Sequence, residues 1–264
     1  MSIPPITLGL YTVFRHACAD FAGTIAAVKQ MGYEGVEMYG EPEQFPAQTV
    51  KEVLAAQALP LTGWHVEWRH LQPDTIEDSI RFFHAAGLQN IIIPCLGGKW
   101  GVGHTPAQEC ESRWDAYLAR IDAVAARLAR EGMRLGYHNH EHEFMIRYGG
   151  HTLFDKLYST MDPAVIMELD TGNAIEGGAD PAQICAGTQR TIFLHCKPYS
   201  RELGFDVTLG DAADANAWRR IVTAAHGRCA QLVIESESAA LDEMENARRC
   251  IEGLKAQLAG LTEG

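Results

Sequence analysis

Acidic and histidine side chains stand at or near the ends of short apolar runs in this sequence. Asp170, His195 and Glu235 are three of them. Carboxylate oxygens together with an imidazole suit a divalent ion such as Mn²⁺, Mg²⁺, Co²⁺ or Zn²⁺. The cysteines form no C-x-x-C pair, which argues against a closed structural zinc site. These residues therefore predict one divalent metal ion with a coordination position open to substrate.

Other groups that bind ligands or transfer protons occupy the same kind of position. They are Glu37, His65, Glu67, His138, His140, Glu143 and Lys197. A single histidine or acid after an apolar run is as often a hydrogen-bonded structural residue as a ligand. The set gains meaning only if the fold brings the ends of the runs together.

The runs alternate with longer helical patterns along the whole chain, which predicts parallel strands joined by crossover helices. Eight of them can be counted, at 6–11, 35–39, 61–67, 90–95, 134–140, 165–170, 191–197 and 231–235. Eight parallel strands close a barrel, and the chemistry of such barrels lies at the carboxyl ends of the strands. We therefore expect a single (β/α)₈ TIM barrel domain over residues 1–264.

Helix signals agree with this rhythm. Apolar residues recur at helical spacing in 114–128 and 241–258, and Thr105-Pro106 and Asp180-Pro181 each offer a cap followed by proline at the first helical position. Gly32, Gly87 and Gly132 stand where helices should end.

An open doubly wound sheet is the rival topology, and it would need a nucleotide-binding fingerprint after the first strand. The sequence has Thr12-Val-Phe-Arg15 there. The glycine-rich stretch 97–103 is not a phosphate-binding loop either, because Lys99 precedes Trp100 and not Ser or Thr. We interpret it as a flexible active-site loop whose Trp100 covers the substrate.

The formal net charge of −12 opposes binding to a nucleic acid or to an anionic membrane. No apolar run is long enough to cross a bilayer. The seven scattered cysteines are typical of reduced thiols in a cytoplasmic protein. The expected partner is a small molecule, and a homo-oligomer would be common for the fold.

Four segments resemble one known family, the xylose isomerase-like TIM barrels, which include sugar-phosphate isomerases and epimerases, inosose dehydratases and endonuclease IV. The segments are Tyr137-His-Asn-His-Glu-His-Glu-Phe144, Glu168-Leu-Asp-Thr-Gly-Asn173, Leu194-His-Cys-Lys197 and Val233-Ile-Glu235. The first is similar to the Y-H-N-H-x-x-E-F signature of a sugar isomerase/epimerase branch, and the resemblance covers nearly the whole chain.

The resemblance implies a ligand set. Epimerases of the family bind one metal with Glu, Asp, His and Glu after strands five to eight, and Asp170, His195 and Glu235 match the last three by position. In strand five His138 occupies the place of the family's Glu, while Glu143 follows slightly later and could reach back from the loop. We expect Glu143 to be the fourth ligand.

The resemblance also implies a reaction, namely isomerisation or epimerisation of a ketose or keto-sugar through a metal-stabilised enediolate, with Mn²⁺ as the first choice of metal. Glu235 or Glu143 would be the base, and His138 and His140, on one face of the strand, would donate protons or orient Glu143. Glu37, His65 and Glu67 would hold sugar hydroxyls. Lys197 would either contact substrate oxygens or pair with a carboxylate at the rim.

Alternatives remain open. An inosose dehydratase or a 3-keto-glycoside lyase would use the same site for β-elimination. An endonuclease IV-like nuclease is opposed by the net charge of −12. A sugar-binding barrel without catalysis would have no need of an intact ligand set.

Overall fold

The chain forms a closed barrel of eight parallel strands, seen in a computed structural model that describes residues 2–97 and 110–261. Their order around the barrel is β1-β10-β9-β8-β5-β4-β3-β2. The strands are β1 (Ile6–Gly9), β2 (Val36–Tyr39), β3 (Leu61–His65), β4 (Asn90–Ile93), β5 (Arg134–His138), β8 (Ile166–Asp170), β9 (Ile192–Cys196) and β10 (Cys229–Ile234). Each lies within or beside one of the eight predicted runs, so the predicted (β/α)₈ barrel is confirmed.

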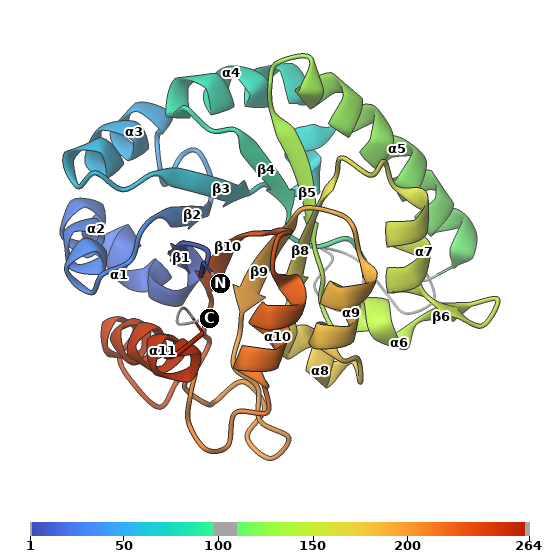
Figure 1. The fold of residues 1–264 in the computed structure, drawn as a ribbon. Coiled ribbons are helices and arrows are strands. Elements are labelled where there is room, and N and C mark those ends of the chain that lie inside the picture. Colours follow the sequence, from blue (N-terminus) through green and yellow to red (C-terminus); the bar gives the residue numbers. More distant parts are fainter. Residues whose placement is uncertain (1, 98–109, 262–264) are drawn as a thin grey trace.

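Helices surround this barrel, and Figure 1 shows α11 beside the N-terminal elements, where it completes the ring. They are α1 (Phe14–Ala19), α2 (Phe21–Gln30), α3 (Ala47–Ala56), α4 (Ile76–Ala86), α5 (Glu111–Ala129), α6 (His142–Met145), α7 (Leu153–Thr160), α8 (Thr171–Glu176), α9 (Pro181–Gly187), α10 (Trp218–Ala225) and α11 (Glu243–Leu258). Two 3₁₀ turns, η1 (Leu10–Val13) and η2 (Trp68–Leu71), and a short hairpin, β6 (Arg147–Tyr148) with β7 (His151–Thr152), complete the described elements.

The helix ends follow the sequence signals that lie within the described residues. The side chain of Asp180 accepts hydrogen bonds from the backbone N–H groups of Ala182 and Gln183 and so caps α9, with Pro181 in the first turn. Gly87 ends α4 in the left-handed conformation, with φ of 75°. The Thr105-Pro106 signal and Trp100 lie outside the described residues.

The barrel interior is apolar only in part. Ile92, Ile166 and Phe193 form a small buried cluster of their own, separate from the main core that the strands make with the helices. Side chains two residues further along a strand point to the same face. In β8 and β9 the next inward positions are therefore Glu168 and His195, so the interior becomes polar toward the carboxyl ends of the strands.

One glycine makes room for a buried acid in this polar part. A Cβ atom on Gly63 of β3 would lie 2.6 Å from Oε2 of Glu37 on the neighbouring strand β2. Real Cβ atoms do not approach another atom so closely, so a larger residue at 63 would displace Glu37. Glycine at position 63 thus leaves space inside the barrel for the carboxylate of Glu37, which is only 1% exposed.

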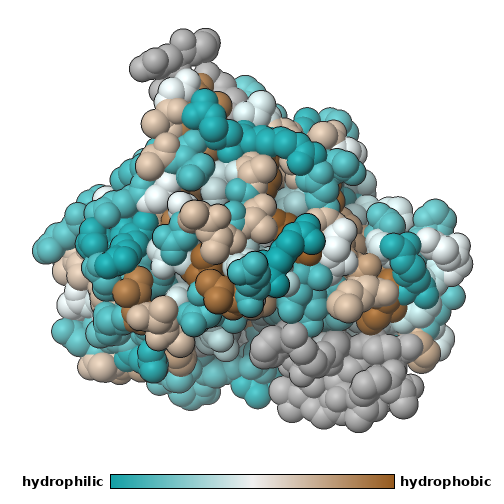
Figure 2. Space-filling view, turned by 90° about the horizontal axis from the view of Figure 1, so that it is seen from below, coloured by the Kyte–Doolittle hydropathy of each residue, from teal (hydrophilic) through white to brown (hydrophobic). Residues whose placement is uncertain are grey.

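The surface is mixed. On the face shown in Figure 2 hydrophilic residues predominate, and hydrophobic ones gather in small separated patches. Among the helices of the described residues, none combines the length and the hydropathy needed to cross a bilayer.

Candidate metal centre and active site

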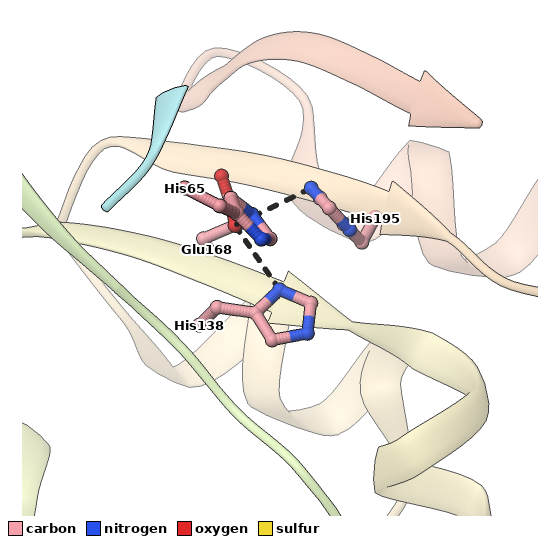
Figure 3. A group of neighbouring side chains, drawn as sticks. All are labelled: His65, His138, Glu168 and His195. Atoms are coloured by element: carbon pink, nitrogen blue, oxygen red, sulfur yellow. Dashed lines mark hydrogen bonds and ion pairs between the residues drawn. The ribbon is translucent and has the colours of Figure 1, made fainter. Parts of the chain in front are cut away.

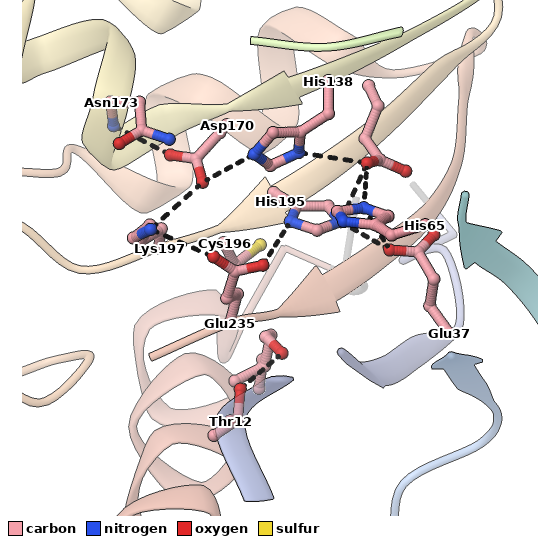
Figure 4. A network of polar contacts seen from close by, with 12 residues as sticks. Thr12, Glu37, His65, His138, Asp170, Asn173, His195, Cys196, Lys197 and Glu235 are labelled. Carbon is pink, nitrogen blue, oxygen red and sulfur yellow. Dashed lines mark hydrogen bonds and ion pairs between the residues drawn. The ribbon is translucent and has the colours of Figure 1, made fainter. Parts of the chain in front are cut away.

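Three predicted ligands meet at the carboxyl ends of adjacent strands. Asp170 ends β8, His195 lies near the end of β9 and Glu235 follows β10 directly. One ligand atom of each lies within 4.8 Å of the others, and all three residues are buried. Nδ1 of His195 lies 3.2 Å from Oε2 of Glu235. Figure 4 shows these side chains converging inside the barrel.

His138 of β5 lies beside this group and next to Asp170. Its Nε2 lies 3.7 Å from Oδ2 of Asp170, and its Nδ1 lies 3.0 Å from Oε2 of Glu168. When Glu168 is ionised it accepts from Nδ1, which leaves the lone pair of Nε2 facing Asp170. His195 is held in the same manner from its other side, because its Nε2 lies 2.7 Å from Oε1 of Glu37. Histidines that bind metals in proteins are commonly fixed by such a carboxylate on the second ring nitrogen.

Glu168 is the centre of a lower polar group, which lies deeper in the barrel. Its Oε2 lies 2.7 Å from Nε2 of His65 and 3.3 Å from Nε2 of His195, besides its contact with His138. Figure 3 shows the three imidazoles arranged around this one carboxylate. His65, His138, Glu168 and His195 also have ligand atoms within 4.8 Å of one another. Each of these imidazole nitrogens, however, already has a carboxylate oxygen at hydrogen-bonding distance.

Asp170, His195 and Glu235 form the upper of the two groups. The two groups differ in how far their buried polar atoms are already hydrogen-bonded. Oδ2 of Asp170 is buried and has no hydrogen-bond partner among the described residues, and Nδ1 of His195 faces Oε2 of Glu235 at 3.2 Å. Buried polar atoms without a partner are costly, and a bound cation would supply the missing interaction. The lower group has one such atom, Oε1 of Glu168. The buried His, Glu and Asp side chains of this region could therefore bind a metal, and the upper group fits one best.

The pKa values of the buried acids in this region are shifted by burial and by neighbouring charges. Burial raises the pKa of Asp170 to about 7, although Lys197 acts in the opposite direction. Burial likewise raises the pKa of Glu168 to about 7, and the neighbouring charge of Glu37 adds to it. Burial alone would also raise the pKa of Glu235, but Lys197 and His195 hold it well below its usual value. Burial and neighbouring charges thus set the pKa values of these three acids in opposite directions.

Lys197 pairs with carboxylates at the rim, which is one of the two roles that the sequence left open. Its Nζ lies 3.0 Å from Oε1 of Glu235 and 4.0 Å from Oδ2 of Asp170, and it also contacts Glu237. The ammonium stands over the ring of Phe205, 4.7 Å from the ring centroid. These partners raise the pKa of Lys197 against the effect of burial, so the side chain stays charged.

Glu143 does not join either group, contrary to the expectation from the sequence. Its carboxylate accepts hydrogen bonds from the hydroxyl of Tyr137 at 2.6 Å and from the backbone N–H of His140 at 2.8 Å. Tyr137 and His138 are successive residues of β5 and point to opposite faces. Because Glu143 lies in the first turn of α6 and turns toward Tyr137, it stays on the helix-facing side of the strand. There it fixes the backbone that carries His140.

A cavity of about 490 Å³ opens above the candidate metal centre. Its walls include His65, His138, His140, Glu235 and Glu237, together with Tyr11, Tyr39, Trp68 and Arg113. Glu37, which we expected to hold sugar hydroxyls, is not among the described residues that line the cavity. It lies below the cavity, where its carboxylate accepts a hydrogen bond from His195. His65 does line the cavity, but its ring nitrogen Nε2 already faces Glu168 and Glu37.

Glu168 is the main residue that the sequence analysis did not single out. It stands two positions before Asp170 in the same strand, and that spacing places both side chains inside the barrel. The alternation of side chains along the strand was enough to predict that Glu168 points into the barrel. Nothing in the sequence, however, indicated that three histidines from β3, β5 and β9 would meet there.

Comparison with known proteins places the chain among its relatives. A family model described as xylose isomerase-like TIM barrel matches residues 25–257. This chain belongs to that family. The rhizopine catabolism protein MocC of Rhizobium meliloti is 24% identical over an alignment of 186 residues that covers 66% of this chain and 56% of that protein. The match therefore spans little more than half of the relative's length.

Solved structures show the same fold for this xylose isomerase-like barrel. A sugar phosphate isomerase/epimerase from Parabacteroides distasonis aligns with a TM-score of 0.77 at 17% identity, over 98% of this chain and 96% of that one. The 3-keto-D-glucoside 4-epimerase of E. coli in its apo form aligns with a TM-score of 0.68 at 16% identity, over 96% and 99% of the two chains.

Proposed function

We propose that this xylose isomerase-like barrel is a divalent-metal-dependent isomerase or epimerase of a ketose or keto-sugar. The observation that carries the proposal is the convergence of Asp170, His195 and Glu235 beneath a cavity, with Nε2 of His138 3.7 Å from Asp170 and the buried Oδ2 of Asp170 without a hydrogen-bond partner among the described residues. The names of the relatives support the choice of sugar chemistry.

The proposed ligands are Nε2 of His138, Oδ2 of Asp170, Nδ1 of His195 and the carboxylate of Glu235. His138 takes the place that we expected Glu143 to fill. Two carboxylates and two imidazoles form a mixed donor set that suits several divalent ions. Mn²⁺ is our first choice, and Zn²⁺ and Co²⁺ are the ions to compare with it. When bound, the metal would polarise a carbonyl and its neighbouring hydroxyl and stabilise the negative charge of the enediolate.

Glu235 is the base in this proposal. It lines the cavity and is 6% exposed, whereas Asp170 is fully buried. Lys197 and His195 keep its carboxylate ionised, so it is ready to take the proton from the carbon beside the carbonyl. A positioned general base typically contributes about 10²–10⁴-fold to the rate.

His140 is the second proton-transfer group. Burial lowers its pKa well below the usual value, so the imidazole is neutral and would readily give up any proton that it takes from the substrate. It reaches the cavity from the end of β5, and β8 and β9 lie between β5 and the β10 strand that precedes Glu235. Two groups that approach a substrate from different strands allow a proton to leave one carbon and return to another face or atom.

β-Elimination is the second candidate reaction, as in an inosose dehydratase or a 3-keto-glycoside lyase. It starts with the same removal of a proton by Glu235, which would then pass this proton to the leaving oxygen while the neutral imidazole of His140 hydrogen-bonds to that oxygen. The position of His140 beside the cavity favours this candidate as much as it favours epimerisation.

The buried unpaired thiols of Cys185, Cys196 and Cys250 agree with a reducing compartment, and we propose that the protein works in the cytoplasm.

A screen of ketoses, inososes and 3-keto-glycosides with Mn²⁺ in D₂O tests the proposed function. We expect deuterium to enter at the carbon beside the carbonyl of at least one compound, and the product to identify the reaction. Binding of a sugar without exchange or turnover would instead indicate a sugar-binding protein.

A further inference from the structure

A second cavity, which we call the side chamber, lies beside the central one and has a volume of about 250 Å³. Its walls come from α1, the end of β2, the end of β3 and helix α4. Four residues, Tyr39, His65, Glu67 and Pro94, line both cavities. The two cavities therefore adjoin. A substrate held over the candidate metal centre would have one of its substituents next to the side chamber.

We propose that the side chamber binds the neutral, apolar ring of a glycoside whose sugar occupies the central cavity. This inference rests on the proposed function for the sugar, but the binding of the ring itself does not. It narrows the substrate class from any keto-sugar to a glycoside with an aromatic or otherwise apolar aglycone.

Aromatic side chains build the chamber wall. Phe14 packs edge-on against Tyr39 with ring centroids 5.2 Å apart, and Phe82 packs edge-on against Trp64 at 5.1 Å. The indole N–H of Trp64 donates to the backbone oxygen of Gly40 at 3.0 Å, so this wall offers no unsatisfied donor at that point. Flat apolar side chains fixed by their neighbours suit an apolar ring.

The charges around the chamber exclude an anionic substituent. Among its described lining residues the acids are Glu41 and Glu67, and there is no Lys or Arg. Glu41 already holds Arg69 and His70, each at 2.7 Å. A phosphate or carboxylate group in the chamber would find His65 and His70 of its described walls already bonded to carboxylates, so a neutral ring is favoured.

The volume also agrees with one ring. An apolar protein cavity of about 150 Å³ is enough to bind benzene. The side chamber, at about 250 Å³, has room for a phenyl ring with a short substituent.

Ser79 of α4 gives a way to fill the chamber without touching the metal centre. It lines the chamber, and its hydroxyl donates to the backbone oxygen of His70 at 2.7 Å. Ser79→Leu removes this hydrogen bond and fills space, whereas Ser79→Ala removes the same hydrogen bond and leaves the space open. Ser79→Met, whose unbranched chain adapts to its surroundings, is a second filling variant if Ser79→Leu unfolds at lower temperature than Ser79→Ala.

The experiment measures the binding of phenol, phenyl β-D-glucoside and methyl β-D-glucoside by ligand-observed NMR titration. We expect wild type and Ser79→Ala to bind phenol, and to bind the phenyl glucoside at least about tenfold more tightly than the methyl glucoside, as burial of a ring implies. Ser79→Leu or Ser79→Met should weaken phenol binding about tenfold and remove most of the preference. Equal affinities for the two glucosides in wild type, or phenol binding unchanged in the filled variants, would overturn the proposal. Failure of the proposed function appears separately, as loss of metal-dependent proton exchange with phenol binding intact.

Discussion

Glu37 accepts a hydrogen bond from Nε2 of His195 at 2.7 Å, and this contact turns the opposite nitrogen, Nδ1, toward Glu235. The pair joins residues 158 positions apart in the chain, one on β2 and one on β9. Because the carboxylate fixes which nitrogen carries the proton, Glu37 is a positioning residue for the candidate metal centre.

Glu37→Ala should therefore weaken metal binding without removing a ligand. Loss of a carboxylate behind a metal-binding histidine typically costs about 10–100-fold in affinity. Competition with a chelator of known affinity measures the change. Glu67→Ala is the matched control, because its side chain is 46% exposed and pairs only with Arg69 among the described ion pairs. An unchanged affinity in Glu37→Ala would show that His195 does not depend on this contact.

The strand-five ligand is tested by a pair of variants. His138→Ala should lower the metal content of the purified protein, since it removes the nitrogen that faces Asp170. Glu143→Gln should keep the metal, but it disturbs a fully buried carboxylate bonded to Tyr137 and to the backbone of His140. We expect its free energy of unfolding to fall by about 1–3 kcal/mol. The reverse pattern, with metal lost from Glu143→Gln and kept by His138→Ala, would restore our first expectation.

His142 predicts a dependence of stability on pH in the metal-free protein. Burial alone would lower its pKa, but the neighbouring carboxylate of Glu143 raises it to about 9. A histidine whose pKa is higher in the folded state than in the unfolded state stabilises the fold below about pH 6.5. That contribution is lost as the pH rises toward 9.

Urea unfolding with a chelator at pH 6 and at pH 9.5 checks this for wild type and His142→Gln. The difference in free energy of unfolding between the two proteins should shrink as the pH rises. A difference that stays constant over this range would mean that folding does not raise the pKa of His142.

Lys197 should matter far more than a lysine at the surface. Lys197→Met leaves Glu235 and Asp170 buried near each other without their ammonium partner. Breaking a buried pair in this manner typically costs about 3–5 kcal/mol of stability. Lys156→Met is the matched control, since Lys156 pairs with the exposed Glu111 and Asp115 and such pairs are worth about 1 kcal/mol or less. Equal losses in metal-free urea unfolding would contradict the account of Lys197.

The sequence was sufficient for the barrel and for three of the four proposed ligands. Alternation of short apolar runs with helical patterns located all eight strands, because each strand of a parallel barrel must be buried on both faces. Asp170, His195 and Glu235 followed from their places at strand ends, since closure of the barrel brings these ends together.

Glu143 shows where the sequence was insufficient. It stands five residues after His138, beyond the end of β5, so the period of two no longer fixes its direction. The backbone enters α6 at this point, and the hydroxyl of Tyr137 attracts the carboxylate to the helix-facing side. The side chamber was equally hidden, because Phe14, Trp64 and Phe82 come from three different elements and meet only in the folded chain.

Metal titration of hydrogen exchange tests the central claim most directly. Metal-free protein is mixed with increasing Mn²⁺, and deuterium uptake at the carbon beside the carbonyl is followed with the compound found in the screen. Exchange should rise until one ion is bound per chain, and Glu235→Gln with its metal retained should show none. Exchange that ignores the metal, or that continues at the wild-type rate in metal-loaded Glu235→Gln, would contradict the account.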